Sequence, residues 1–400
     1  MKRKSNSGFV FALLAAFVGL RSAPAPAADI PLTSSLPIQQ TVLISVTPSL
    51  GPRIPFIGDG TAHLAYELYL SNYSRKSVRI VALRVHGSRG SAFEVSIEGD
   101  TLKDSFIEAA AANRGKPHDP VLAPGAAGSI YIFLNFGSRK TPTQLDNSIV
   151  AETEGEVGNE QLIPIATVAV EAPAAAATID APFAGDRWQA ANGPSNTSLH
   201  RRAVIVLDGQ AKSPERYAID WIKLGDDGNN FTGDEHQNSS YHAYDTPIIA
   251  VADGRAVTVL DGIPENIPHR EQMAITMTAA TMAGNSIVED IGGGRYVGYA
   301  HFRPGTITVK TGDTIHRGQV LGKLGNSGNS TEPHLHLQIC DGPTFLTCNG
   351  LPMQFQSMML SKYRIEKQGE KPIRLTIDGA PRDVAGQEPM EDELVTFSGQ

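Results

Sequence analysis

The chain has 400 residues, a length that at about 100–200 residues per domain predicts two or three domains. Hydrophobic residues make up 41% of it, which is too many for an intrinsically disordered chain, and the formal net charge of −8 argues against a general nucleic-acid-binding protein, whose surface is basic. With 39 glycines and 26 prolines, the composition favours a mainly β, turn-rich protein over one built from long helices.

Residues 1–27 have the pattern of a secretory signal peptide. Three basic residues lie near the start, an apolar run spans 9–20, and Ala25-Pro26-Ala27 is typical of a cleavage site. The alternative is an uncleaved anchor. Later segments do not reach the roughly 18 consecutive apolar residues of a membrane span, so we expect a secreted or periplasmic protein without a stable span after signal removal.

Residues 28–172 contain short segments in which apolar and polar residues alternate, as in HLAYELYL (63–70) and FEVSIE (93–98). This period of two is typical of strands with one buried face and predicts a β-sandwich, of which the immunoglobulin-like fold is one form. The segment TLKDSFIEAAAANRG (101–115) instead predicts a helix. We find no catalytic constellation in this sequence, and we expect its histidines to be structural or surface residues: His63, His86 and His118.

Residues 173–185 are rich in Ala and Pro, a composition that predicts a linker. A second β domain is expected over 186–360, where further apolar segments alternate with turn sequences. The remaining residues, 361–400, are expected to form a C-terminal extension that ends in a loose acidic tail.

The chain has two cysteines and 11 histidines. Two thiols are too few for a multi-cysteine zinc site, so a metal site in this chain must use imidazoles and carboxylates. Outside the cytoplasm, Cys340 and Cys348 could form a disulfide, and their spacing alone leaves this open.

The sharpest local feature is His334-Leu335-His336. On a β-strand, residues i and i+2 point to the same face, so both imidazoles would project side by side while Leu335 faces the core. Such a pair can ligate a metal together, or one imidazole can ligate while the other transfers protons.

Three segments lead up to this pair along the chain: Tyr299-Ala300-His301, a hairpin sequence over 309–322, and GNSGNSTEPHLH over 325–336, which includes the pair itself. Together with TPIIAVADGRAVTV (246–259), they resemble the lysostaphin/LytM-type zinc metalloendopeptidases over about residues 186–355. The resemblance implies an antiparallel β domain with a duplicated hybrid motif and one Zn²⁺ ion. It also implies that zinc-activated water cleaves peptide bonds, in peptidoglycan cross-links or in another peptide substrate.

The resemblance assigns roles residue by residue. The second histidine of the HLH motif is the family's zinc ligand and the first is a catalytic histidine, which gives these roles to His336 and His334. The histidine of the Tyr-Ala-His element lies at the catalytic water or the developing oxyanion, which gives that role to His301.

The family's other two ligands are a histidine and an aspartate spaced H-x3-D, and this chain departs from that spacing. One assignment takes His200 and Asp220, because Asp220 has apolar neighbours and a buried carboxylate is costly unless it is paired or metal-bound. The other takes His242 and Asp245, whose i, i+3 spacing does not suit one strand face. We prefer His200 and Asp220, which requires an insertion over 225–241.

Other interpretations stay open. A catalytically inactive LytM-like module would bind the cell wall and regulate another hydrolase, and the irregular spacing of His200 and Asp220 is its main support. A structural β protein with a vestigial site is another. The hairpin also resembles biotinyl or lipoyl carriers, but TGDTIHRG (311–318) lacks the lysine that such carriers modify. The domain's other histidines are expected to face solvent: His236, His269 and His316.

Overall fold

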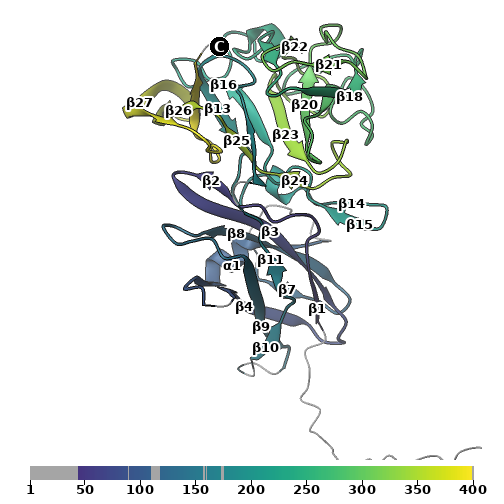
Figure 1. Cartoon of the computed structure of the whole chain (residues 1–400), viewed down its shortest axis with the longest axis vertical. Coiled ribbons are helices and arrows are strands. Elements are labelled where there is room, and N and C mark those ends of the chain that lie inside the picture. Colours follow the sequence, from purple (N-terminus) through teal and green to yellow (C-terminus); the bar gives the residue numbers. More distant parts are fainter. Residues whose placement is uncertain are drawn as a thin grey trace, which may run out of the picture. The chain divides into compact units, whose positions relative to one another are not determined.

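The computed structural model describes residues 44–88, 90–109, 118–155, 158, 160–172 and 175–398. The predicted signal peptide lies outside these residues. The described part is mainly β, as the composition predicts (Figure 1). No helix within it is long and apolar enough to cross a membrane.

Two antiparallel sheets enclose one apolar core in the N-terminal part, which confirms the predicted β-sandwich. Even-numbered residues of β3, such as Leu64 and Leu68, point into this core, as the alternation predicts. The first sheet has the order β1-β3-β8-β6 with β2 on β3, and the second has the order β10-β9-β4-β5 with β7 on β4 and β11 on β9. An immunoglobulin-like form stays a prediction. The strands are Ile44–Pro48 (β1), Phe56–Gly58 (β2), Thr61–Asn72 (β3), Val78–Gly87 (β4), Glu94–Glu98 (β5), Phe106–Glu108 (β6), Val121–Leu122 (β7), Ala127–Asn135 (β8), Gln144–Thr153 (β9), Gln161–Pro164 (β10) and Val168–Ala169 (β11).

The helix predicted over 101–115 is shorter than expected. Helix α1 spans Gly99–Ser105, and the chain turns extended at Phe106, whose φ and ψ are −101° and 135°. Phe106 and Ile107 are buried and pair with β8, so burial in the sheet outweighs the helix propensity of this alanine-rich sequence. Residues 110–117 lie outside the described part of the chain.

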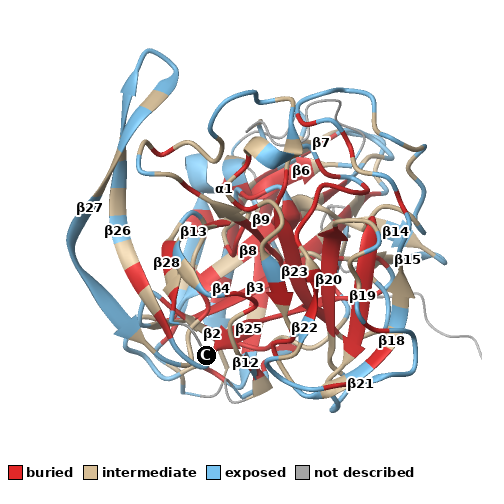
Figure 2. Cartoon of the chain, turned by 90° about the horizontal axis from the view of Figure 1, so that it is seen from above, coloured by how far each residue is buried: buried red, intermediate tan, exposed pale blue. Residues whose placement is uncertain are grey.

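An eleven-stranded sheet forms the centre of the C-terminal part, with the order β21-β18-β19-β20-β23-β16-β13-β28-β26-β27 and β24 also on β23. Its strands are Gly185–Ala191 (β13), Ile219–Lys223 (β16), Gly254–Leu260 (β18), Asn285–Asp290 (β19), Tyr296–Phe302 (β20), Thr314–Ile315 (β21), Leu335–Cys340 (β23), Gly350–Leu351 (β24), Met358–Gln368 (β26), Lys371–Val384 (β27) and Leu394–Phe397 (β28). Figure 2 shows β19, β20 and β23 almost wholly buried, whereas the β26–β27 hairpin is largely exposed.

Smaller strand pairs and short 3-10 helices also occur among the described residues of this part. They include the 3-10 helices η2 (His200–Arg202) and η3 (Asn238–Ser240), and the remaining strands are Ala177–Ile179 (β12), Ile205–Leu207 (β14), Gln210–Lys212 (β15), Pro247–Ile249 (β17), Val320–Lys323 (β22, paired with β17) and Met353–Phe355 (β25). Strand β12 comes from the segment predicted as a linker and pairs in parallel with β25. The domain bounds stay a proposal.

The expectation of a loose acidic tail is wrong for the described residues, which reach 398. Strand β28 lies between β13 and β26 in the sheet, and Glu388 is fully buried. The acidic composition does not reveal this, because strand pairing depends on partners far away in the sequence.

Candidate active site

Strand register brings the central site residues to one face of the sheet. Asp220 of β16 is the register partner of His336 of β23, and Ala300 of β20 is the partner of His336 on the other side. Residues directly opposite each other in antiparallel strands project to the same face, so Asp220 and His336 meet while the small Ala300 leaves space beside them. A cleft of about 310 Å³ opens over this face.

The helix η2 adds His200 to this pair. His200 Nε2 lies 3.1 Å from Asp220 Oδ2, and His336 Nδ1 lies 2.9 Å from Asp220 Oδ1. One potential ligand atom of each residue lies within 4.8 Å of the others, and all three residues are buried. The structure therefore brings together the three residues that we preferred as metal ligands.

His334 precedes β23 and faces the same cleft, since its Nε2 lies 3.4 Å from Asp220 Oδ1. His301 reaches the cleft by a different route. In a regular strand it would share the face of Tyr299, whose hydroxyl lies in the core. A β-bulge sets Ala300 and His301 opposite one residue of β19, and His301 has a φ of +69°. Its ring centroid then lies 4.7 Å from that of His334.

Hydrogen bonds on the far side of each ring fix which nitrogen faces the cleft. The Nδ1 atoms of His200, His301 and His334 lie 3.1, 2.7 and 2.8 Å from backbone oxygens of Ala218, Ser327 and Glu332. A carbonyl oxygen only accepts, so each Nδ1 carries a proton and each neutral ring presents a lone pair at Nε2.

His336 has the reverse arrangement, because its Nε2 lies 2.9 Å from Gln338 Oε1 and its Nδ1 faces Asp220. Two imidazole lone pairs and a carboxylate thus converge on one point. When His200 is neutral, this donor set fits a divalent cation, because acceptors that face one another repel unless a proton or a cation lies between them.

The pKa values follow from burial and from the single carboxylate. Burial opposes ionisation of Asp220, but the neighbouring His200 and His334 hold its pKa well below the ordinary value. Burial lowers the pKa of His200, and Asp220 more than offsets this, raising the pKa to about 9. Without a metal ion His200 is therefore protonated near pH 7, and a bound cation would displace that proton. Burial and the two neighbouring imidazoles hold the pKa of His301 well below its ordinary range. Asp220 is therefore ionised and His301 neutral near pH 7.

The alternative ligand pair lies elsewhere. Asp245 accepts hydrogen bonds from Arg303 Nη1 at 2.6 Å and Lys323 Nζ at 2.7 Å. His242 lies against Thr232 in a separate cleft. Neither residue joins the cluster of His200, Asp220 and His336.

The other histidines lie outside this cluster. His269 and His316 are exposed, as expected, whereas His236 is half-buried with Nδ1 3.0 Å from Pro268 O. His63 is buried and its Nε2 contacts Asp59 Oδ1 at 3.1 Å. His86 is exposed, and the His118 ring packs near Phe106.

Two residues at the site escaped the sequence analysis. Gln338 orients His336 and continues the i, i+2 series from His334, so strand periodicity could have identified it. Asn192 donates from Nδ2 to Asp220 Oδ2 at 2.9 Å. It lies just after β13 with a φ of +53°, and only the turn-forming Asn-Gly sequence marks it.

A disulfide joins Cys340 and Cys348, which the spacing left open. It closes the loop that carries Phe345 and Leu346, and both side chains line the cleft. The disulfide therefore constrains part of the wall beside the histidine cluster.

Residues 236–346 match the model of peptidase family M23, so the chain contains an M23 peptidase domain and the resemblance inferred from the motifs is confirmed. The match includes His301, His334 and His336, whereas His200 and Asp220 precede it.

Similar solved structures include the catalytic domain of the M23 protein EnpA from Enterococcus faecalis, with 18% identity over 45% of this chain and 95% of that one and a TM-score of 0.25. The lysostaphin catalytic domain from Staphylococcus simulans has 20% identity over 41% and 86%, with a TM-score of 0.22. A zinc-containing peptidase from Vibrio cholerae has 13% identity over 77% and 83%, with a TM-score of 0.21.

Proposed function

We infer that the chain is a zinc metalloendopeptidase whose metal ligands are His200, Asp220 and His336. The observation that carries this proposal is the convergence of two imidazole nitrogens and one ionised carboxylate at a single buried point of the cleft. When bound there, Zn²⁺ would supply a Lewis acid that acidifies water and polarises a carbonyl group. The M23 domain supports the peptidase assignment.

We assign the orientation and deprotonation of the attacking water to His301 and His334. Each presents Nε2 to the cleft, and in the neutral ring this atom accepts a proton. We assign His334 to take the proton of the attacking water and to donate it to the leaving amine. His301, which is neutral near pH 7, accepts a hydrogen bond from that water through Nε2 and so orients it for attack.

The substrate that we propose is a peptide in peptidoglycan cross-links, and the location is extracytoplasmic. The signal-peptide pattern of residues 1–27 and the disulfide support this location. An inactive binding module is not favoured, because it would have no need of both His334 and His301 facing the ligand cluster.

Digestion of purified peptidoglycan tests this proposal. The chain is incubated with cell wall, and the soluble fragments are analysed by mass spectrometry for new amino termini. We expect peptide-bond cleavage that a zinc chelator abolishes and that added Zn²⁺ restores. His316→Ala, at an exposed position outside the cleft, serves as the control for His334→Ala. Absence of cleavage by a zinc-loaded chain would refute the proposed substrate, and cleavage of another peptide substrate would retain the peptidase assignment.

A further inference from the structure

A carboxylate is buried on the face of β3 that should meet solvent. Odd-numbered residues of this strand point away from the sandwich core, so the alternation predicts that they are exposed. Ala65 and Glu67 are instead buried, and Glu67 has no exposed surface. The Tyr217 hydroxyl contacts the backbone of Ala65, and two arginines of the C-terminal part cover Glu67.

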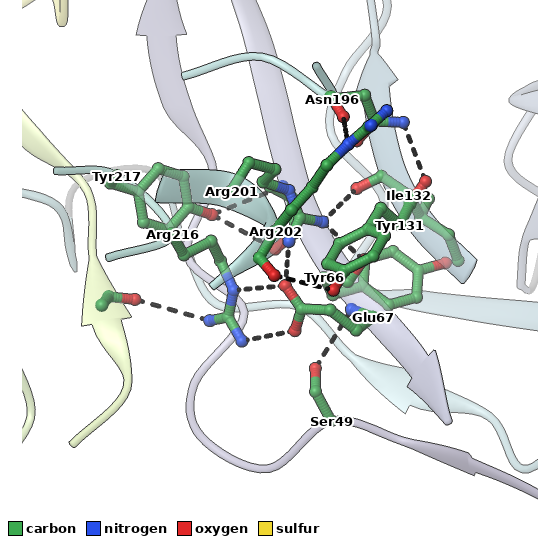
Figure 3. Close-up of polar contacts among 12 residues, drawn as sticks. Ser49, Tyr66, Glu67, Tyr131, Ile132, Asn196, Arg201, Arg202, Arg216 and Tyr217 are labelled. Carbon is green, nitrogen blue, oxygen red and sulfur yellow. Dashed lines mark hydrogen bonds and ion pairs between the residues drawn. The ribbon is translucent and has the colours of Figure 1, made fainter. Parts of the chain in front are cut away.

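Two guanidinium groups hold the Glu67 carboxylate (Figure 3). Arg216 binds both of its oxygens, with Nε 3.0 Å from Oε1 and Nη2 2.7 Å from Oε2. Arg201 also donates from Nη1 to Oε1. Burial raises the pKa of Glu67, but the two arginines outweigh it and lower the pKa to about 2. Glu67 is therefore ionised at any pH at which the protein would work.

Arg201 is the residue that follows His200 in the chain. Its Nη2 donates to Tyr66 O at 2.9 Å and to Ile132 O at 3.1 Å, so its guanidinium is bonded to both β3 and β8. The same group lies 5.0 Å from the centroid of the Tyr131 ring. These bonds tie η2, which carries His200, to two neighbouring strands of the sandwich.

Arg216 lies in the turn that leads into β16, the strand that carries Asp220. Besides Glu67 it contacts Gly350 O at 3.4 Å, and it is buried. A single carboxylate of the N-terminal part is thus bonded to both segments that deliver His200 and Asp220 to the metal site.

We propose that Glu67 is a positioning residue for the metal site and that the sandwich, through Arg201 and Arg216, completes the geometry of His200 and Asp220. Burying three charges is costly, and apolar residues of similar size often give equal or greater stability at such positions. What this charged cluster adds is a defined orientation of the two segments, because each guanidinium fixes its segment through several hydrogen bonds at once. This inference rests on the proposed function, which supplies the ligand roles.

The test uses the full chain and compares Glu67→Gln with Glu388→Gln. Glu388 is equally buried at the same junction, where its N–H donates to Ile57 O at 2.8 Å, but its carboxylate bonds to Met353 and not to a ligand-bearing segment. Zn²⁺ affinity is measured by competition with a chromogenic chelator. Hydrogen exchange of the metal-free proteins is measured over residues 198–222.

We expect Glu67→Gln to lower Zn²⁺ affinity about tenfold or more, the size of effect seen when groups behind metal ligands are removed. Exchange around His200 should become faster, and Glu388→Gln should change neither quantity. If Glu67→Gln does not fold, Arg201→Lys replaces it. This variant keeps the positive charge but lacks the fork that reaches both backbone oxygens, and the same changes are expected.

The proposal is overturned if a folded Glu67 or Arg201 variant binds Zn²⁺ and exchanges like the wild type, or if Glu388→Gln has an equal effect. A wild-type chain that binds no Zn²⁺ would refute the proposed function instead. The exchange comparison would then still decide whether Glu67 holds the His200 segment.

Discussion

Asp220 Oδ1 lies 2.9 Å from His336 Nδ1, and the two residues are register partners on adjacent antiparallel strands. Their separation is set by the sheet and not by a loop, because β16 and β23 lie within the sheet with partners on both sides. A one-residue slip of either strand would turn its side chain to the opposite face. Strand pairing therefore fixes the relative positions of Asp220 and His336, and the helix η2 adds His200 to them.

Gln338 should control how well His336 binds metal. Its Oε1 accepts a hydrogen bond from His336 Nε2 at 2.9 Å, which leaves the Nδ1 lone pair toward Asp220. We expect Gln338→Leu to lower Zn²⁺ affinity about 10- to 100-fold, because groups that orient ligand histidines have effects of this size. Gln338→Glu keeps the acceptor and should retain most of the affinity. Equal affinities for the two variants, by chelator competition, would show that this bond has no orienting role.

His334 should act on the rate and not on metal content. We expect His334→Ala to reduce kcat about 100-fold or more, the range of general acid–base catalysis, while the bound zinc stays close to one ion per chain. Steady-state kinetics and metal analysis of the same preparation check this. A His334→Ala protein that loses its zinc would make His334 a ligand and not a proton carrier.

The disulfide should act on substrate binding. Replacing both Cys340 and Cys348 by Ser releases the loop that carries Phe345 and Leu346. We expect the free energy of unfolding to fall by about 2–3 kcal/mol, from the loop-closure entropy of a short loop. KM should rise more than kcat falls, because the loosened residues line the cleft. An unchanged KM in the double variant would remove this loop from the substrate-binding surface.

Stability should fall with rising pH because of Glu289. Burial raises the pKa of this residue to about 7, from an ordinary value of 4.5, although the Tyr299 hydroxyl donates to its carboxylate. Between these two pKa values the folded state holds a proton that the unfolded state has lost. The contribution is thus full below pH 4.5 and is lost as the pH rises toward 7, by at most about 3 kcal/mol.

Glu289→Gln should flatten this dependence and stabilise the protein at pH 8 relative to the wild type. Urea unfolding at pH 5 and pH 8 measures the effect. A variant that shows the same difference between the two pH values as the wild type would mean that another group is responsible.

Local periodicity predicted the sandwich and the shared face of His334 and His336, because both depend on neighbouring residues. It did not predict how His301 enters the cleft, since a regular strand would direct this side chain to the core and only a bulge with a positive φ reverses it. The Tyr-Ala-His motif therefore identified His301 as a site residue but did not predict how its side chain reaches the cleft.

Glu67 and the C-terminal strand show a different limit. Alternation placed Glu67 on a solvent face, and the two arginines that bury it lie more than a hundred residues away in the chain. The strand β28 was missed for the same reason, because its partners β13 and β26 are brought to it only by the complete sheet.

The zinc content of the purified full chain tests the central claim most directly. Metal analysis of the wild type is compared with Asp220→Ala and His336→Ala, and Asp245→Ala is the matched control, because its carboxylate is held by Arg303 and Lys323 away from the cluster. We predict one zinc ion per chain in the wild type and in Asp245→Ala, and almost none in the other two variants. A wild type that does not take up zinc, or an Asp220→Ala protein that keeps it while Asp245→Ala loses it, would contradict the account.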